Sequence, residues 1–226
     1  MAKPSGPAAL RRLRAIVGDT DPRLAVRDQT PLPAPFEELI GRPLRRGSVV
    51  AVAGEIARVS LGMALMARVS AEGGWCGVVG LPSLGCLAAS ELGVRTDRLA
   101  LVPQPGPAWA EVTAALLSGL DAVLVQPAGP VPGQLARRLA ARARQYRCTV
   151  FTLGQVWEGS DVRVAAVDQE WFGLGPGAGR LHSRMVRMIA STRPGSQLDL
   201  WLPGQDGEIR LADIRTAPEL LPVAAV

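Results

Sequence analysis

Short apolar runs alternate with longer amphipathic segments over most of the chain. The run Ser48-Val49-Val50-Ala51-Val52-Ala53 is continuous rather than alternating, as in a strand that is buried on both faces of a sheet. Similar runs predict strands at residues 48–53, 75–79, 99–102, 122–125 and 149–153. Amphipathic segments between them predict helices at residues 59–72, 84–92, 108–118 and 134–147. This alternation with short connections predicts an α/β fold: a mostly parallel sheet flanked by helices.

The pattern changes after Gln155. Segments at residues 162–167, 183–190, 197–202 and 208–211 are predicted as strands, with a hairpin turn at residues 203–207. Between the first two, Gly173, Gly175, Gly177 and Gly179 predict a flexible loop, because their spacing differs from the G-x-G-x-x-G of dinucleotide sites. We therefore expect an antiparallel C-terminal extension of the same sheet.

The pattern divides the chain into four parts. Residues 1–43 are expected to form an N-terminal arm with a short basic helix, Leu10–Val17, and a proline-rich linker at residues 31–35. Residues 44–160 form the α/β core and residues 161–216 the antiparallel extension. Residues 217–226 form a tail.

The composition argues against several kinds of functional site. The chain has 226 residues and a net charge of +5, which permits contact with nucleic acid without establishing it. Lys3 is its only lysine and His182 its only histidine, so lysine chemistry in the core and multi-histidine metal sites are not expected. Cys76, Cys86 and Cys148 form no C-x-x-C pair, and buried free thiols are favoured over a zinc site. No apolar run approaches the ~18 residues of a membrane helix, so we expect a cytoplasmic protein.

The first strand-to-helix turn is where an open α/β sheet places its ligand. A phosphate-binding P-loop reads G-x-x-x-x-G-K-[ST]. In this frame Ala53 stands for the first glycine, Arg58 for the second and Val59 for the lysine, and only Ser60 keeps its type. Arg58 itself is a candidate for holding a phosphate; the competing interpretation is that Arg58 and Glu55 only decorate a tight turn. We expect no nucleotide or other cofactor, no metal and no catalytic residue.

Four segments resemble the RecA core. They are Gly47–Glu55, Glu91–Leu99, Asp121–Gln126 and Thr149–Gln155. The resemblance implies a RecA-like, P-loop-type fold. It puts Gln126 where an acid should order Mg²⁺, and Gln155 in the position that senses the γ-phosphate. The segment Gly80-Leu81-Pro82-Ser83 lacks the acid of the RecA catalytic position, which implies a degenerate ATPase.

Two further segments, Leu44–Ala51 and Trp171–Gly179, resemble the ImuA group of inducible-mutagenesis proteins in its actinobacterial form. This resemblance implies a non-catalytic accessory factor of damage-induced mutagenesis and translesion synthesis, with nucleoid association on damage. Its partners would be an ImuB-like Y-family polymerase homologue and an error-prone replicative-type polymerase, with RecA as a further candidate. Two alternatives stay open: a RecA-type ATPase whose site is completed by a partner or by Arg58, and a SulA-like division inhibitor that binds FtsZ.

Two surfaces are candidates for contact with DNA or a partner protein. On the predicted helix 134–147, apolar residues fall on one side and arginines cover the rest: Arg137, Arg138, Arg142, Arg144 and Arg147. A solvated outer face is the competing interpretation. Trp171 and Phe172 either stack on bases or anchor the adjacent loop by burial.

Overall fold

The structure is a computed structural model that describes residues 28–175, 178–195, 197–204 and 209–212. The predicted basic helix Leu10–Val17, the turn residues 205–207 and the tail 217–226 lie outside these ranges.

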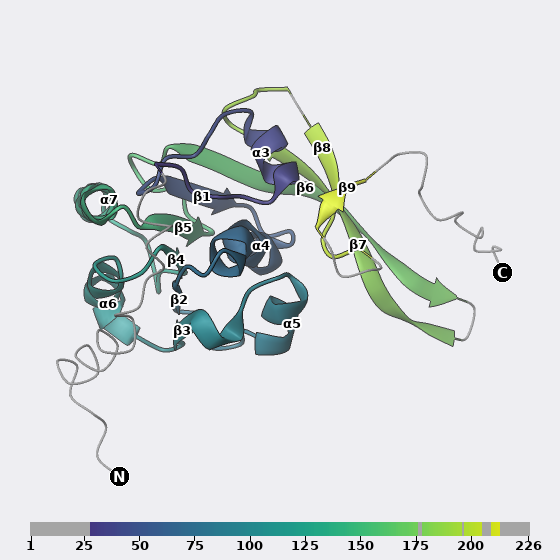
Figure 1. The fold of residues 1–226 in the computed structure, drawn as a ribbon, viewed down its shortest axis with the longest axis horizontal. Helices are drawn as coiled ribbons and strands as arrows, with labels where there is room; N and C mark the ends of the chain where they lie inside the picture. Colours follow the sequence, from purple (N-terminus) through teal and green to yellow (C-terminus); the bar gives the residue numbers. More distant parts are fainter. Residues whose placement is uncertain (1–27, 176–177, 196, 205–208, 213–226) are drawn as a thin grey trace, which may run out of the picture.

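One nine-stranded sheet organises the molecule, in the order β3-β2-β4-β5-β1-β6-β7-β8-β9 (Figure 1). The strands from β3 to β6 in this order pair in parallel, and those from β6 to β9 pair antiparallel. The mostly parallel α/β part and its antiparallel C-terminal part are therefore confirmed. The strands are β1 (Val49–Ala53), β2 (Cys76–Val79), β3 (Leu99–Val102), β4 (Ala122–Val125), β5 (Thr149–Leu153), β6 (Val162–Gly175), β7 (Ala178–Ala190), β8 (Gln197–Trp201) and β9 (Arg210–Leu211).

Helices cover both faces of the parallel part. They are α3 (Ala34–Ile40), α4 (Arg58–Ala71), α5 (Cys86–Glu91), α6 (Trp109–Leu116) and α7 (Gly133–Tyr146). Figure 1 shows α6 and α7 on one side of the sheet and α3, α4 and α5 on the other. Alternate residues of β1 serve the two layers: Val50 and Val52 join the α4 cluster, and Val49 joins the α6 and α7 cluster. Within the described ranges, no helix has both the length and the apolarity needed to cross a bilayer.

Helix α3 lies in the predicted N-terminal arm, and its first two residues belong to the predicted proline-rich linker. Its first turn contains Pro35, which is favourable there because the first N–H groups of a helix have no intrahelical acceptor. Phe36 is fully buried in the same cluster as Val186 of β7 and Leu200 of β8. The helix ends at Gly41, which adopts φ +68° and donates its N–H to the Glu37 carbonyl. Residues 34–40 therefore pack into the core.

Strands β6 and β7 are longer than predicted. The ladder continues to the pairs Leu174↔Gly179 and Gly175↔Ala178, with register shifts between Ala166 and Asp168 and between Phe172 and Leu174. The prediction of a flexible loop over residues 173–179 is therefore wrong for its described residues. Backbone pairing needs no side chain, so glycines that suggest a loop in sequence can complete a two-stranded ribbon. Figure 1 shows this ribbon continuing past β8 and β9, away from the helices.

Candidate functional site

The turn after β1 lies at the carboxyl end of a central strand, which β5 and β6 flank. The helix that follows β1 and the helix that follows β4 lie on opposite faces of the sheet. Ligands of open α/β sheets bind at the carboxyl ends of strands where the connections diverge in this way. The segments after β1, β4 and β5 therefore surround the candidate site.

The turn itself has a strained backbone. Gly54 adopts φ +77°, and Ala57, which caps α4, adopts the left-handed conformation with φ +52°. Left-handed geometry costs a residue with a Cβ atom roughly 1–2 kcal/mol. Ala57 provides no side-chain cap, so the first N–H groups of α4 meet no capping side chain. The turn thus retains the partial positive charge of a helix N-terminus.

Arg58 fills the space that this turn encloses. Its Nη1 donates to Glu55 Oε1 at 2.7 Å, and the Arg58 side chain is only 21% exposed. On the other side it lies against the end of β5: a Cβ atom added to Gly154 would come within 2.8 Å of Nη1. The buried Nε has no hydrogen-bond acceptor in the described part of the chain. An anion at the N-terminus of α4 would therefore meet the Arg58 guanidinium, whose partner Glu55 is 83% exposed, in place of open glycine backbone.

The remaining turn residues offer no replacement for a lysine. Val59, which stands at the lysine position, is half-buried and packs against the apolar cluster around α4. Ala53 and Ser60 are also half-buried. The structure brings all five predicted positions together because they are consecutive or nearly so in the chain.

The two glutamines after β4 and β5 line neighbouring segments. Gln155 accepts the N–H of Val131 at 3.1 Å and donates to the Gly129 carbonyl at 2.8 Å, so its amide joins the segments after β4 and β5. Gln126 is half-buried at the end of β4, and its N–H donates to the Val79 carbonyl. Gln155 therefore has a structural use that its position in sequence did not reveal.

The arginines of α7 are largely paired within the chain. Arg137 pairs with Glu158, Arg144 with Asp161 at 3.5 Å and Arg147 with Asp28 at 2.7 Å. Arg142 stacks over the Tyr146 ring, 5.3 Å from its centroid. Arg138 has no hydrogen bond or ion pair within the described residues. Three carboxylates therefore offset much of the positive charge that the sequence placed on this face.

Trp171 and Phe172 belong to strand β6. Phe172 is buried and packs on Trp201 with ring centroids 5.1 Å apart. Trp171 is 45% exposed, and the Arg184 guanidinium lies 4.7 Å from its ring centroid. Neighbouring strand residues point to opposite faces, so only one of this aromatic pair can meet a ligand. Sequence reasoning missed Arg184, because only the β6–β7 register places it opposite Trp171.

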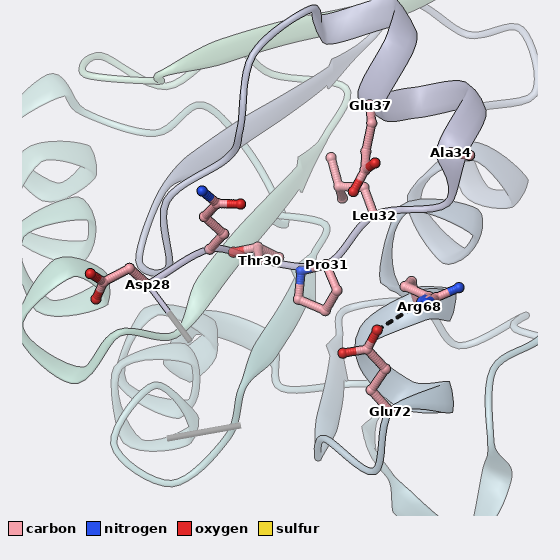
Figure 2. A pocket seen from close by; sticks show the side chains of 9 residues that line it. Asp28, Thr30, Pro31, Leu32, Ala34, Glu37, Arg68 and Glu72 are labelled. Atoms are coloured by element: carbon pink, nitrogen blue, oxygen red, sulfur yellow. Dashed lines mark hydrogen bonds and ion pairs between the residues drawn. The ribbon is translucent and has the colours of Figure 1, made fainter. Parts of the chain in front are cut away.

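A large cavity lies elsewhere, at the far end of α4 (Figure 2). It has a volume of about 550 Å³ and is open to solvent between residues 28–32, the start of α3 and the end of α4. Asp28, Glu37, Arg68 and Glu72 supply its charges, and Figure 2 shows Arg68 bonded to Glu72. None of the predicted site residues lines it.

The thiols and the histidine form no cluster. Burial raises the pKa of Cys76 and Cys148, whereas Cys86 is exposed on α5, so the expectation of buried thiols is wrong for Cys86. His182 Nδ1 lies 3.1 Å from the Ser183 hydroxyl. Among the described residues, no three acidic, cysteine or histidine side chains gather as metal ligands would.

Comparison with known proteins identifies the family to which the chain belongs. A model described as the MT3502 N-terminal domain matches residues 37–159, which contain β1 to β5 and the turn after β1. A Mycobacterium tuberculosis relative, described as uncharacterized protein Rv3395c, is 42% identical over 108 residues. The match covers 47% of this chain and 53% of the relative, so the chain spans about half of that relative's length.

Proposed function

This chain belongs to the MT3502 N-terminal domain family, and we propose that it is a non-catalytic, RecA-like accessory protein of damage-induced mutagenesis and translesion DNA synthesis. On this proposal the chain acts by binding other proteins. The α/β core supplies a rigid body, and the degenerate turn after β1 is a remnant of an ATP site.

The observation that carries the proposal is the position of Arg58. A working phosphate site needs glycine there so that backbone N–H groups can wrap the phosphates. Here the Arg58 side chain lies between the turn and Gly154 and is bonded to Glu55. Val59 removes the lysine charge as well. Loss of one charged partner in a buried contact costs about 2–5 kcal/mol, which weakens nucleotide binding by at least an order of magnitude.

Two other positions support the same conclusion. Gln126 ends β4 where the resemblance to RecA calls for a magnesium-ordering acid, and an amide cannot supply that charge. Gln155 uses its amide to join the segments after β4 and β5. The order of the core strands and the position of β1 between β5 and β6 fit a RecA-like core.

The partners follow from the resemblance to the ImuA group. They are an ImuB-like Y-family polymerase homologue and an error-prone replicative-type polymerase, with RecA as a further candidate. The α7 arginines are a weaker candidate for DNA contact, because Glu158, Asp161 and Asp28 pair with three of them. On this proposal the protein is cytoplasmic and moves to the nucleoid after damage.

Calorimetric titration with Mg-ATP tests the degenerate site directly. We expect no saturable binding by the full chain or by Arg58→Ala. Micromolar affinity in the wild type would overturn the proposal. In cells, deletion of the gene is expected to lower the frequency of damage-induced mutations. A copy of the gene that carries Arg58→Ala, introduced into the deletion strain, is expected to restore that frequency. An unchanged mutation frequency in the deletion strain would contradict the cellular role.

The unpaired Nε of Arg58 favours one alternative, an ATPase in which Arg58 holds phosphate once a partner completes the site. That function predicts ATP turnover stimulated by DNA or by the partner and abolished in Arg58→Ala. A SulA-like inhibitor instead predicts filamentous cells on overproduction, without a rise in mutation frequency. ATP turnover, the mutation frequency of the deletion strain and cell length on overproduction therefore separate the three functions.

A further inference from the structure

The outer part of the β6–β7 ribbon, residues 169–175 and 178–184, extends beyond the strands that flank it. Pairing of β6 with β1 ends at Ala165, and pairing of β7 with β8 begins at Met185. The backbone N–H of Arg184 donates to the Pro203 carbonyl, and its carbonyl accepts the N–H of Leu202. Before Arg184 on β7, and along β6 from Gln169, no further strand pairs with an outer edge within the described residues. Such edges present open N–H and C=O groups that can accept an extended chain.

Apolar side chains are concentrated on this outer ribbon. Its exposed large residues are Trp171 at 45%, Leu174 at 69% and Leu181 at 48% exposure. An isolated two-stranded ribbon is marginally stable in water. An exposed apolar group on such an element marks an interaction surface rather than a scattered surface residue.

Arg184 adds a charge that none of the described acidic residues neutralises. The residue is 6% exposed. Its Nε donates to the Leu202 carbonyl at 3.1 Å and its Nη1 to Gln169 Oε1 at 3.4 Å. Nη2 meets no acceptor, and no carboxylate pairs with this guanidinium, in the described part of the chain. Burial lowers the pKa of Arg184, which reflects the unfavourable removal of its charge from water.

The nearest acid in sequence does not reach this face. Glu170 lies opposite Met185, whereas Trp171 lies opposite Arg184, and neighbouring strand residues point to opposite faces. The face that carries Trp171 and Arg184 is therefore apolar and cationic. A carboxylate brought by a partner would form a charge-assisted bond with Nη2 beside the Trp171 ring.

We propose that the outer β6–β7 ribbon is a docking surface for an extended protein segment that carries one carboxylate flanked by apolar side chains. The carboxylate binds Arg184, an apolar side chain covers Trp171, and the backbone pairs with a free edge of the ribbon. This inference deepens the proposed function, since it rests on a protein-binding role and names the chemistry of the partner.

Charge favours a protein segment over nucleic acid. Affinity for nucleic acid comes mainly from several phosphate contacts by basic residues. The outer ribbon carries only two arginines, Arg180 and Arg184, and one acid, Glu170. Two cations and an acid suit a single carboxylate better than a polyanion.

Selection from a displayed library of random twelve-residue peptides on the full-length protein tests this surface. We expect enriched peptides to carry Asp or Glu between apolar residues. A synthesised peptide from the selection should bind Trp171→Ala about thirtyfold more weakly, as for a central aromatic anchor. Leu87→Ala is the matched control: Leu87 is 74% exposed on α5, away from the ribbon, and its truncation should leave binding unchanged.

The charge contact is tested by a double-mutant cycle. Changing the peptide acid to its amide should weaken binding to the wild type at least tenfold and have little effect on Arg184→Gln. If Arg184→Gln does not fold, Arg184→Lys keeps the charge and removes only the forked geometry. Peptides without an acid, binding that Trp171→Ala leaves unchanged, or no enrichment at all would overturn the inference.

Competition between the selected peptide and a single-stranded DNA oligonucleotide tests whether the ribbon binds nucleic acid instead of a protein segment. Displacement of the peptide by DNA, lost in Trp171→Ala, would assign the ribbon to nucleic acid and overturn the proposal. The Mg-ATP titration is independent of the ribbon, so failure of this inference and failure of the proposed degenerate site are distinguishable.

Discussion

The buried ion pair between Arg46 and Asp121 gives a quantitative prediction for the amino ends of the strands. The Arg46 and Asp121 side chains are 9% and 6% exposed. Asp121 Oδ1 pairs with Arg46, and Oδ2 accepts the N–H of Trp75 at 2.9 Å. The substitution Asp121→Asn keeps the size of the side chain and an oxygen for Trp75 but removes the negative charge. It leaves the Arg46 guanidinium buried without this counter-charge.

Removing one partner of a buried pair costs about 3–5 kcal/mol. In a domain of this length, each kcal/mol shifts the thermal midpoint by roughly 2–4 °C, so Asp121→Asn should lower it by roughly 6–20 °C. Urea denaturation followed by tryptophan fluorescence measures the free energy of unfolding. The control is Asp97→Asn, because the Arg95–Asp97 side chains are 49% and 60% exposed and such a pair contributes about 0–1 kcal/mol. Equal losses in the two variants would refute the argument from burial.

Three further predictions address the arm, its anchor and the second strand-to-helix connection. Phe36→Ala should lower the free energy of unfolding by about 3–5 kcal/mol in urea denaturation, because Phe36 is fully buried in the core. A loss below about 1 kcal/mol would show that residues 34–40 contribute little to the core. The bond from Arg147 lowers the pKa of Asp28 from 3.8 in the folded protein. The contact therefore stabilises the fold above pH 4, and this stabilisation is lost as the pH falls through the lowered pKa of Asp28 in the folded state. Stability measured from pH 7 to pH 2 should therefore differ between wild type and Asp28→Asn only at the higher pH. Gly80→Ala should be destabilising by at least 1 kcal/mol in the same assay, because Gly80 adopts φ +82° and a Cβ atom would collide with the Gln126 carbonyl oxygen; an unchanged midpoint would contradict this.

The parallel part of the fold is predictable because its strands are short apolar runs, and those inside the sheet are buried on both faces. Continuous apolar runs between glycine and proline residues locate Leu99–Val102, Ala122–Val125 and Thr149–Leu153 at the observed bounds. Helix α3 escapes the same reasoning, because Pro33 and Pro35 suggest a linker even though proline suits the first turn of a helix.

The candidate site is predictable only where it is contiguous in sequence. The spacing of Ala53, Arg58 and Val59 locates the altered turn without a structure. The contact of Arg58 with Gly154 depends on β5 lying beside β1, which residue spacing does not encode. The pairing of Trp171 with Arg184 likewise depends on a ladder running through glycines that suggest a loop.

The position of β1 also constrains how the protein is synthesised. Val49 pairs with Val150 and Val50 with Val162, so both neighbours of β1 are translated about a hundred residues after it. On the ribosome, both edges of β1 stay open until β5 is made, and the edge that pairs with β6 stays open until the chain has grown past Ala165. A nascent chain that stops before that point exposes Val49 to Val52, which are completely buried in the finished protein. Such fragments are candidates for chaperone binding and degradation, and the α4 cluster cannot be completed before β6 arrives, because Val162 and Val164 belong to it.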